Sequence, residues 1–224
     1  MQVATGKSIL NGVAIGPLRI YRKEETQTAV SSTLTVAEEL ARFDSARVKA
    51  QEQLGALYEK ALDEVGEENA AIFEIHEMML DDDDYLDAVK SIIETQGATA
   101  EYAVATTGEN FAAAFADMED AYMKARATDI KDVSSRVVNI LSGATEGNAL
   151  GDEPAILVAD DLTPSETVQL DKSKLLGFIT RYGSSNSHTA ILARTMNIPA
   201  LIGVEYDDSW DGKLAVLDGY NHCV

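Results

Sequence analysis

One histidine in this sequence stands where phosphate chemistry is feasible. His188 follows the turn-forming run Gly-Ser-Ser-Asn-Ser at 183–187. An apolar run at 175–180 predicts a buried strand before that turn, and the apolar spacing after it predicts a helix that ends before Pro199. His188 is therefore expected in the first turn of a helix, where unpaired backbone N–H groups and the helix dipole attract phosphate and disfavour an imidazolium. A neutral imidazole in that place is a nucleophile for phosphorus.

A plainer explanation of this position competes with the chemical one. A histidine near the start of a helix is more often a capping or packed surface residue, so spacing alone leaves both roles open. The segment 200–204 predicts another strand after the helix, and 155–158 predicts a strand before it, with a short helix between them from Pro164 to about Leu170. This alternation of strands and helices indicates an α/β domain.

The earlier part of the chain predicts helices. Two short strands are expected at 9–21, and a capping box of Thr35 and Glu38 then starts a helix over 36–65 that Gly66 ends. A second helix is expected over 67–80, continuing over 84–95 after an acidic run. A third follows from 99 to about 115, and a fourth covers 120–141. Four helices with short links predict an antiparallel bundle.

The order of these elements predicts a discontinuous domain. We expect an α/β phosphohistidine domain over 1–34 and 144–224, interrupted by an all-α four-helix bundle over 35–143. The early strands at 9–21 are assigned to the same domain as the late ones, an arrangement that the pattern permits.

Charge and composition restrict the partners. The chain has 224 residues with 18 Lys and Arg against 38 Asp and Glu, a formal net charge of −20. Such a chain repels nucleic acid and anionic membranes and suits a partner with a neutral or basic face. Cys223 is the only cysteine, which excludes an internal disulfide and fits a reducing cytoplasm. We expect no signal peptide, no membrane span and no metal site in this chain.

Two stretches carry a family resemblance. The run GSSNSHTAILARTMNIPALIG at 183–203 resembles the phosphohistidine signature of the phosphoenolpyruvate-utilising enzymes. The run DLTPSETVQL at 161–170 resembles Enzyme I of the bacterial sugar phosphotransferase system, and the similarity covers its amino-terminal half. The family's usual turn is Gly-Gly-Arg/Lys-Thr-Ser-His, whereas Ser184, Ser185 and Asn186 stand at the middle positions here. The turn therefore lacks the family's cation.

The resemblance implies site residues. His188 would carry the phosphate on its Nε2 atom, and the hydroxyl of Thr167 would contact the imidazole. Ser187 and Thr189 flank the histidine and could bond the phosphate, although helix capping explains both equally well.

The resemblance also implies a docking surface for the small phosphocarrier protein HPr, in which an acidic rim surrounds apolar side chains. A solvated helix break explains the acidic run 81–84 on its own. The implied contacts are Glu67, Glu68, Ala71, Ile72, His76, Met78, Met79, Asp82, Asp84, Tyr85, Met123 and Arg126.

The function implied is phosphotransfer from phosphoenolpyruvate to HPr through His188, in sugar uptake in the cytoplasm. Phosphoenolpyruvate and Mg²⁺ would bind in a carboxy-terminal part that we expect beyond Val224. The whole enzyme would be a homodimer and this part of it a monomer. Two alternatives stay open: the swivelling histidine domain of a pyruvate phosphate dikinase or phosphoenolpyruvate synthase, and a non-catalytic acidic docking module.

Overall fold

The structure is a computed structural model of the chain, and it describes residues 3–22, 28–144, 150–151, 153–183 and 187–224. The chain forms two compact units. The first, called here the α/β unit, comprises Met1–Glu24, Ala61–Asn69 and Gly147–Val224. The second, called here the helical unit, comprises Glu25–Lys60 and Ala70–Glu146. Each unit is discontinuous in sequence, and the helices Val36–Val65 and Glu67–Met79 each belong partly to both.

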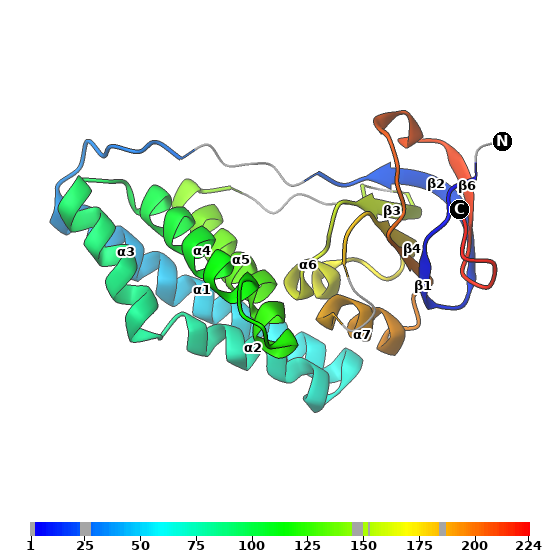
Figure 1. Ribbon diagram of the computed structural model, residues 1–224, viewed down its shortest axis with the longest axis horizontal. Helices are drawn as coiled ribbons and strands as arrows, with labels where there is room; N and C mark the ends of the chain where they lie inside the picture. The colour runs from blue at the N-terminus through cyan, green and yellow to red at the C-terminus, as the bar shows by residue number, and fades with distance from the viewer. Residues whose placement is uncertain (1–2, 23–27, 145–149, 152, 184–186) are drawn as a thin grey trace. The chain divides into compact units, whose positions relative to one another are not determined.

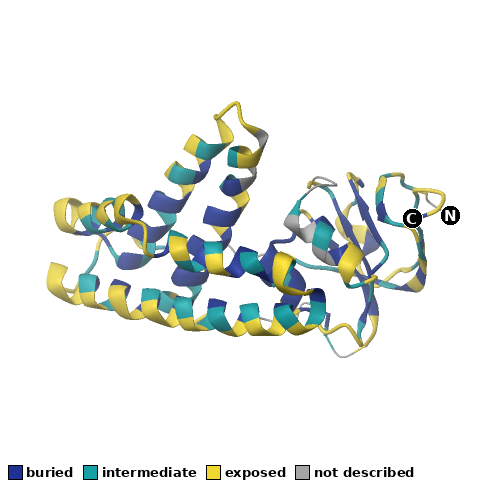
Figure 2. Ribbon diagram, turned by 90° about the horizontal axis from the view of Figure 1, so that it is seen from below, coloured by how far each residue is buried: buried dark blue, intermediate teal, exposed yellow. Residues whose placement is uncertain are grey.

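The helical unit is built on amphipathic helices. Their buried faces are dark blue in Figure 2 and carry Phe43, Leu54, Phe73 and Val89, each of which is fully buried. Apolar residues at three- and four-residue spacing place these side chains on one face of each helix. The helices are α1 (Val36–Val65), α2 (Glu67–Met79), α3 (Asp83–Gln96), α4 (Ala100–Ala116) and α5 (Ala121–Ser142).

Local side chains determine where these helices begin and end. Thr35 and Glu38 form the predicted capping box at α1, because the Glu38 carboxylate accepts from the Thr35 N–H at 2.8 Å and the Thr35 hydroxyl accepts from the Glu38 N–H at 3.3 Å. Thr99 and Asp120 cap α4 and α5 in the same way. Gly143 ends α5 with a φ of 65°, a left-handed conformation that favours glycine.

The predicted second helix is two helices. Asp82 has an extended backbone and its carboxylate accepts from the Tyr85 N–H at 3.0 Å, so α3 starts anew after α2. The acidic run is therefore a break with its own cap, and the described residues of the unit form five helices where the sequence predicted four. The predicted fold class, an α/β domain with an inserted helical bundle, is confirmed.

One curled mixed sheet organises the α/β unit. Its strand order is β1-β5-β4-β3-β2-β6. The pairs β2–β3, β3–β4 and β4–β5 are parallel, and β1–β5 and β2–β6 are antiparallel. Parallel pairing puts the carboxyl ends of β3, β4 and β5 at one edge. The strands are β1 (Lys7–Leu10), β2 (Val13–Ile20), β3 (Ala155–Ala159), β4 (Leu175–Thr180), β5 (Ala200–Ile202) and β6 (Leu214–Asp218).

Two apolar cores lie on the two faces of this sheet. Helices α6 (Pro164–Gln169) and α7 (His188–Thr195) lie beside one face (Figure 1). The first core contains Phe178 of β4 with Ala190 and Ala193 of α7. The second core contains Ile179 of β4 with Trp210, which ends the short 3₁₀ helix η1 (Asp208–Trp210). Within the described ranges, no helix is both long and apolar enough to cross a membrane.

Candidate active site

The backbone places His188 at the first position of α7, as the sequence predicted. The helix follows β4 after a turn, and its inner face is held by Ala190 and Ala193, which are both buried. The side chains of His188 and Thr189 and the turn 184–186 lie outside the described residues. The structure therefore describes the strand and helices that position the histidine, but not its imidazole.

Ser187 caps α7. Its hydroxyl oxygen accepts from the Ala190 N–H at 3.2 Å, and its carbonyl accepts from the Ile191 N–H at 3.0 Å. One lone pair of the Ser187 hydroxyl oxygen thus accepts a hydrogen bond at the start of α7. The capping role that the sequence left open for Ser187 is present in the structure.

Thr167 occupies the buried side of α6, which packs against α7 (Figure 1). Its hydroxyl donates to the carbonyl of Thr163 at 2.9 Å. Because the only hydroxyl proton is used in that bond, the oxygen of Thr167 has lone pairs left to accept another proton. Thr167 thus offers an acceptor on the helix beside the one that His188 starts.

A capping box fixes α6 and hence Thr167. The Thr163 hydroxyl accepts from the Glu166 N–H at 3.2 Å, and the Glu166 carboxylate accepts from the Thr163 N–H at 2.8 Å. The Tyr21 hydroxyl also donates to Glu166 at 3.1 Å, which links α6 to the end of β2. The sequence analysis did not single out this box, although the spacing of Thr163 and Glu166 carries the signal.

Two family models match the chain. The amino-terminal model of the PEP-utilising enzymes matches residues 5–126, and the model of their mobile domain matches residues 151–222. The chain belongs to the family of PEP-utilising enzymes. The mobile-domain match contains both His188 and Thr167, and the amino-terminal match contains α1 to α4.

Relatives within this family carry one name. The chain is 40% identical to the phosphoenolpyruvate-protein phosphotransferase of Geobacillus stearothermophilus over 220 residues, and 39% identical to that of Bacillus sp. (strain S) over 219 residues. Each alignment covers 96% of this chain but only 38% of the relative. An NMR solution structure of Enzyme I has a TM-score of 0.76 and 35% identity, covering 99% of this chain and 92% of that one. The chain thus spans well under half the length of the curated relatives.

The family's expected docking residues divide by exposure. Among the exposed ones, Met78 at the end of α2 has 71% of its side chain accessible. Ala71, Met79 and Met123 are half-buried. The acidic residues predicted for the rim are all exposed: Glu67, Glu68, Asp82 and Asp84.

Four of the predicted contacts are buried in the helical unit: Ile72, His76, Tyr85 and Arg126. The Tyr85 hydroxyl lies 2.9 Å from the Ser134 hydroxyl, and burial raises the pKa of Tyr85 to about 12. The side chains of these four residues make contacts inside the bundle. A role for them in binding a partner is therefore supported only by the resemblance.

His76 and Arg126 belong to one buried polar cluster that links α2 to α5. The His76 Nε2 atom lies 3.4 Å from the Asp129 carboxylate, and Nδ1 lies 3.9 Å from that of Asp132. Arg126 donates to Asp129 at 3.1 Å and also to the Tyr122 hydroxyl. The sequence analysis missed the two aspartates, although their three-residue spacing after Arg126 puts all three on one face of α5.

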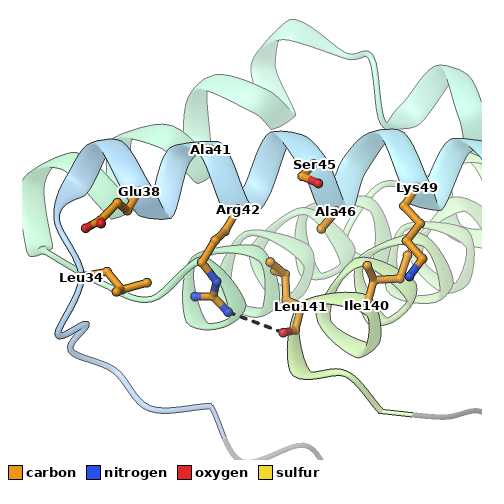
Figure 3. A pocket seen from close by; sticks show the side chains of 9 residues that line it. All are labelled: Leu34, Glu38, Ala41, Arg42, Ser45, Ala46, Lys49, Ile140 and Leu141. Carbon is orange, nitrogen blue, oxygen red and sulfur yellow. Dashed lines mark hydrogen bonds between the residues drawn. The ribbon is translucent and has the colours of Figure 1, made fainter.

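A groove of about 640 Å³ opens in the helical unit between α1 and the end of α5 (Figure 3). In it Arg42 donates to the Leu141 carbonyl at 3.5 Å, and Lys49 also lines it. Arg42 is held by Glu39 and Glu101. None of the predicted site residues lines this groove, so we assign it no part in the chemistry.

Proposed function

We propose that this chain is the phosphohistidine part of a phosphoenolpyruvate-protein phosphotransferase and that His188 exchanges phosphate with a small phosphocarrier protein, HPr. The observation that carries the proposal is the placement of His188 at the first position of α7, beside the helix that holds Thr167. The free N–H groups and the dipole of such a helix start favour a phosphate there. The family match and the name of its curated relatives support the same activity.

The proposed step exchanges one P–N bond for another. The Nε2 lone pair of neutral His188 attacks the phosphorus of phosphorylated HPr in line with the leaving nitrogen. The bond from phosphorus to the HPr imidazole breaks, and its electron pair stays on that nitrogen. If each phosphoimidazole keeps a proton on its other ring nitrogen, no proton needs to enter or leave.

Thr167 has a defined part in this step. Because its hydroxyl already donates to Thr163, it interacts with His188 as an acceptor, and the proton that it accepts has to come from Nδ1–H. That hydrogen bond selects the tautomer whose lone pair is on Nε2. It also stabilises the positive charge that the ring gains when phosphate is attached.

The proposed docking surface lies on α2 and the start of α3. Exposed Met78 supplies an apolar centre, and the exposed carboxylates of Asp82 and Asp84 supply a negative rim. Burial, and then the charges of nearby acidic residues, raise the pKa of Glu77 next to Met78. A partner with a basic rim around an apolar patch relieves this crowding of negative charge, which is the complementarity expected for HPr.

Phosphoenolpyruvate and Mg²⁺ are proposed to act outside these residues, in a longer cytoplasmic protein that dimerises. Among the side chains that the structure describes, no three His, Cys, Asp or Glu residues are grouped as a metal ion would need.

Incubation with ³²P-phosphorylated HPr tests the proposal. Wild-type chain should take up label that is stable in base and labile in acid, and mass spectrometry should place it on His188. The variant His188→Ala should stay unlabelled. Thr167→Val keeps the shape of the side chain and should slow labelling by about 100- to 1,000-fold, the range expected for losing one positioned hydrogen bond to the transition state. Label that survives in His188→Ala contradicts the proposal, and an unlabelled but HPr-binding wild type indicates a docking module without turnover.

A further inference from the structure

A cluster of charged and aromatic side chains closes the sheet edge from which the His188 loop departs. Asp160 directly follows β3, Arg181 directly follows β4, and Glu205 and Tyr206 follow β5. These are the three parallel strands whose carboxyl ends meet at one edge. The turn to His188 starts two residues after Arg181.

Arg181 binds all of the other three residues. Its guanidinium lies 2.6 Å from the Asp160 carboxylate and 3.3 Å from that of Glu205, and it donates to the Tyr206 carbonyl at 2.8 Å. The guanidinium carbon also lies 4.3 Å from the centre of the Tyr206 ring, a cation–π distance. The Tyr206 hydroxyl donates to Asp160 at 3.0 Å, which closes the cluster. One arginine therefore ties the ends of three strands together.

Main-chain bonds and one hydroxyl bond hold the first part of the loop next to this cluster. The backbone N–H of Arg181 donates to the Ala159 carbonyl at 3.1 Å, and the backbone N–H of Tyr182 donates to the Asp160 carbonyl at 2.8 Å. The buried Thr180 hydroxyl donates to the Tyr182 carbonyl at 2.7 Å. Gly183 then turns the chain with a φ of 112°, where a side chain is disfavoured. The backbone that leads to His188 is thus fixed from Thr180 to Gly183.

The arginine side chain lies on the sheet face away from α7. Along β4, Phe178 belongs to the core that contains Ala190 of α7, whereas Ile179 belongs to the core on the other face. Arg181 continues the side of Ile179 because side chains alternate along a strand, and its partner Tyr206 packs against that second core. Contact between Arg181 and phosphate on α7 does not fit this placement.

We propose that Arg181 is a positioning residue for His188: it anchors the base of the histidine loop to the ends of β3 and β5. This inference rests on the proposed phosphotransfer. Loss of the guanidinium removes the side-chain contacts between the ends of β3, β4 and β5, and we expect the imidazole then to depart from the in-line geometry that the proposed step needs. A displacement of about 1 Å in such a reaction costs on the order of 100-fold in rate.

Single-turnover labelling from ³²P-phosphorylated HPr tests the rate. Arg181→Ala should lower the maximal rate about 10- to 100-fold and leave the half-saturating HPr concentration unchanged. Arg181→Lys keeps the charge but cannot reach three partners, so an intermediate rate is expected. The matched control is Arg22→Ala, which removes an exposed arginine that pairs with Asp208 and should leave the rate unchanged. A wild-type rate in Arg181→Ala, or equal losses in both alanine variants, overturns the inference.

A second measurement does not depend on activity. Long-range ¹H–¹⁵N spectra report which nitrogen of the His188 imidazole carries the proton. Arg181→Ala should shift these ¹⁵N signals towards a mixture of tautomers at a temperature where circular dichroism shows the variant folded. If wild type takes no phosphate, the proposed function fails, but the spectra still decide on Arg181: unchanged His188 signals overturn its positioning role. A rate loss that only follows the unfolded fraction overturns it as well.

Discussion

Replacing Glu39 with glutamine should destabilise the helical unit by about 2 to 4 kcal/mol at neutral pH. The Glu39 side chain on α1 is 2% exposed. Its carboxylate accepts from the Ala100 N–H at 3.0 Å, from Arg42 at 2.7 Å and from the Ser32 hydroxyl. It therefore joins α1 to the first residue of α4 and to the segment before α1.

The magnitude follows from what each partner loses. A hydrogen bond to a charged group contributes about 1.5–3 kcal/mol, and a buried N–H left without a partner costs about 1–3 kcal/mol. Glutamine keeps one oxygen, so it can still accept from Ala100 or from Arg42 but presents an NH₂ group to the other donors. Arg42 also keeps its second partner, Glu101, so the loss stays below the full cost of about 3–5 kcal/mol for isolating a buried charge.

The effect should depend on pH with a defined sign. Burial, the largest single influence, raises the pKa of Glu39, but the hydrogen bonds from Ser32 and Ala100 and the charge of Arg42 together lower it below its ordinary value. A depressed pKa in the folded state means that the unfolded state binds the proton more tightly. The stabilisation is therefore complete above the ordinary glutamate pKa of about 4.3 and is lost as the pH falls through the folded-state value.

Urea unfolding, followed with two probes, measures the change in the free energy of unfolding. Circular dichroism reports mainly on the helices, and fluorescence of Trp210, the only tryptophan, reports on the α/β unit. Glu39→Gln should shift the dichroism transition at pH 7, and the shift should shrink below about pH 4. Glu52→Gln, an exposed change on the same helix, is the control and should stay within about 0.5 kcal/mol. A Glu39 effect as small as the control, or one that is equal at pH 7 and pH 3, refutes the reasoning.

Three further outcomes are expected. Gly108→Ala should lower the free energy of unfolding by about 1–3 kcal/mol, because the new Cβ would lie 2.5 Å from the Ser134 Cβ. Gly55→Ala should instead stabilise α1 by up to about 1 kcal/mol, because its Cβ meets only the flexible Glu77 carboxylate 3.2 Å away. Thermal unfolding of the two variants compares these effects. Met78→Ala should speed dissociation of HPr, and added salt should slow its association, both measured by surface plasmon resonance. NMR chemical-shift changes on HPr addition that map to the face around Cys223 instead of α2 and α3 would contradict this. Tyr85, with a pKa of about 12, should stay protonated at pH 11 in the folded chain, as absorbance at 295 nm reports; because the unfolded side chain ionises near pH 10, stability should fall as the pH rises above that value.

Local signals made the helices of this fold predictable. The bounds of α1 agree with the expected 36–65 because Thr35, Glu38 and Gly66 act within one turn of each end. The separate start of α3 was missed because an acidic run gives several candidate caps, and only the backbone at Asp82 selects one. The grouping of the early strands with the late ones was implied by the resemblance and only permitted by the order of the elements, and the strand order and directions were not predicted.

The site was predictable only where it is formed by residues that are close together in the sequence. His188 at the start of α7 follows from the local pattern of strand, turn and helix. The clusters around His76 and Arg181 join residues distant in sequence, and no local pattern pairs Asp132 with α2 or Asp160 with Arg181. From the sequence alone, Asp132 and Asp160 cannot be distinguished from solvated carboxylates, because only tertiary packing places an imidazole or a cation beside them.

The interruption of the sheet has a consequence for the order of folding. Parallel strands β2 and β3 meet at Leu18 and Ile156, so pairing them in an otherwise unfolded chain closes a loop of roughly 140 residues at an entropic cost of about 4 kcal/mol. Thr28 and Ser142, at the two ends of the inserted segment, line one groove of the helical unit. A helical unit that has already formed through its short-range contacts therefore brings β2 and β3 close and removes most of that cost. Slow assembly of the sheet should then be found in variants that weaken the helices, even where every strand residue is unchanged.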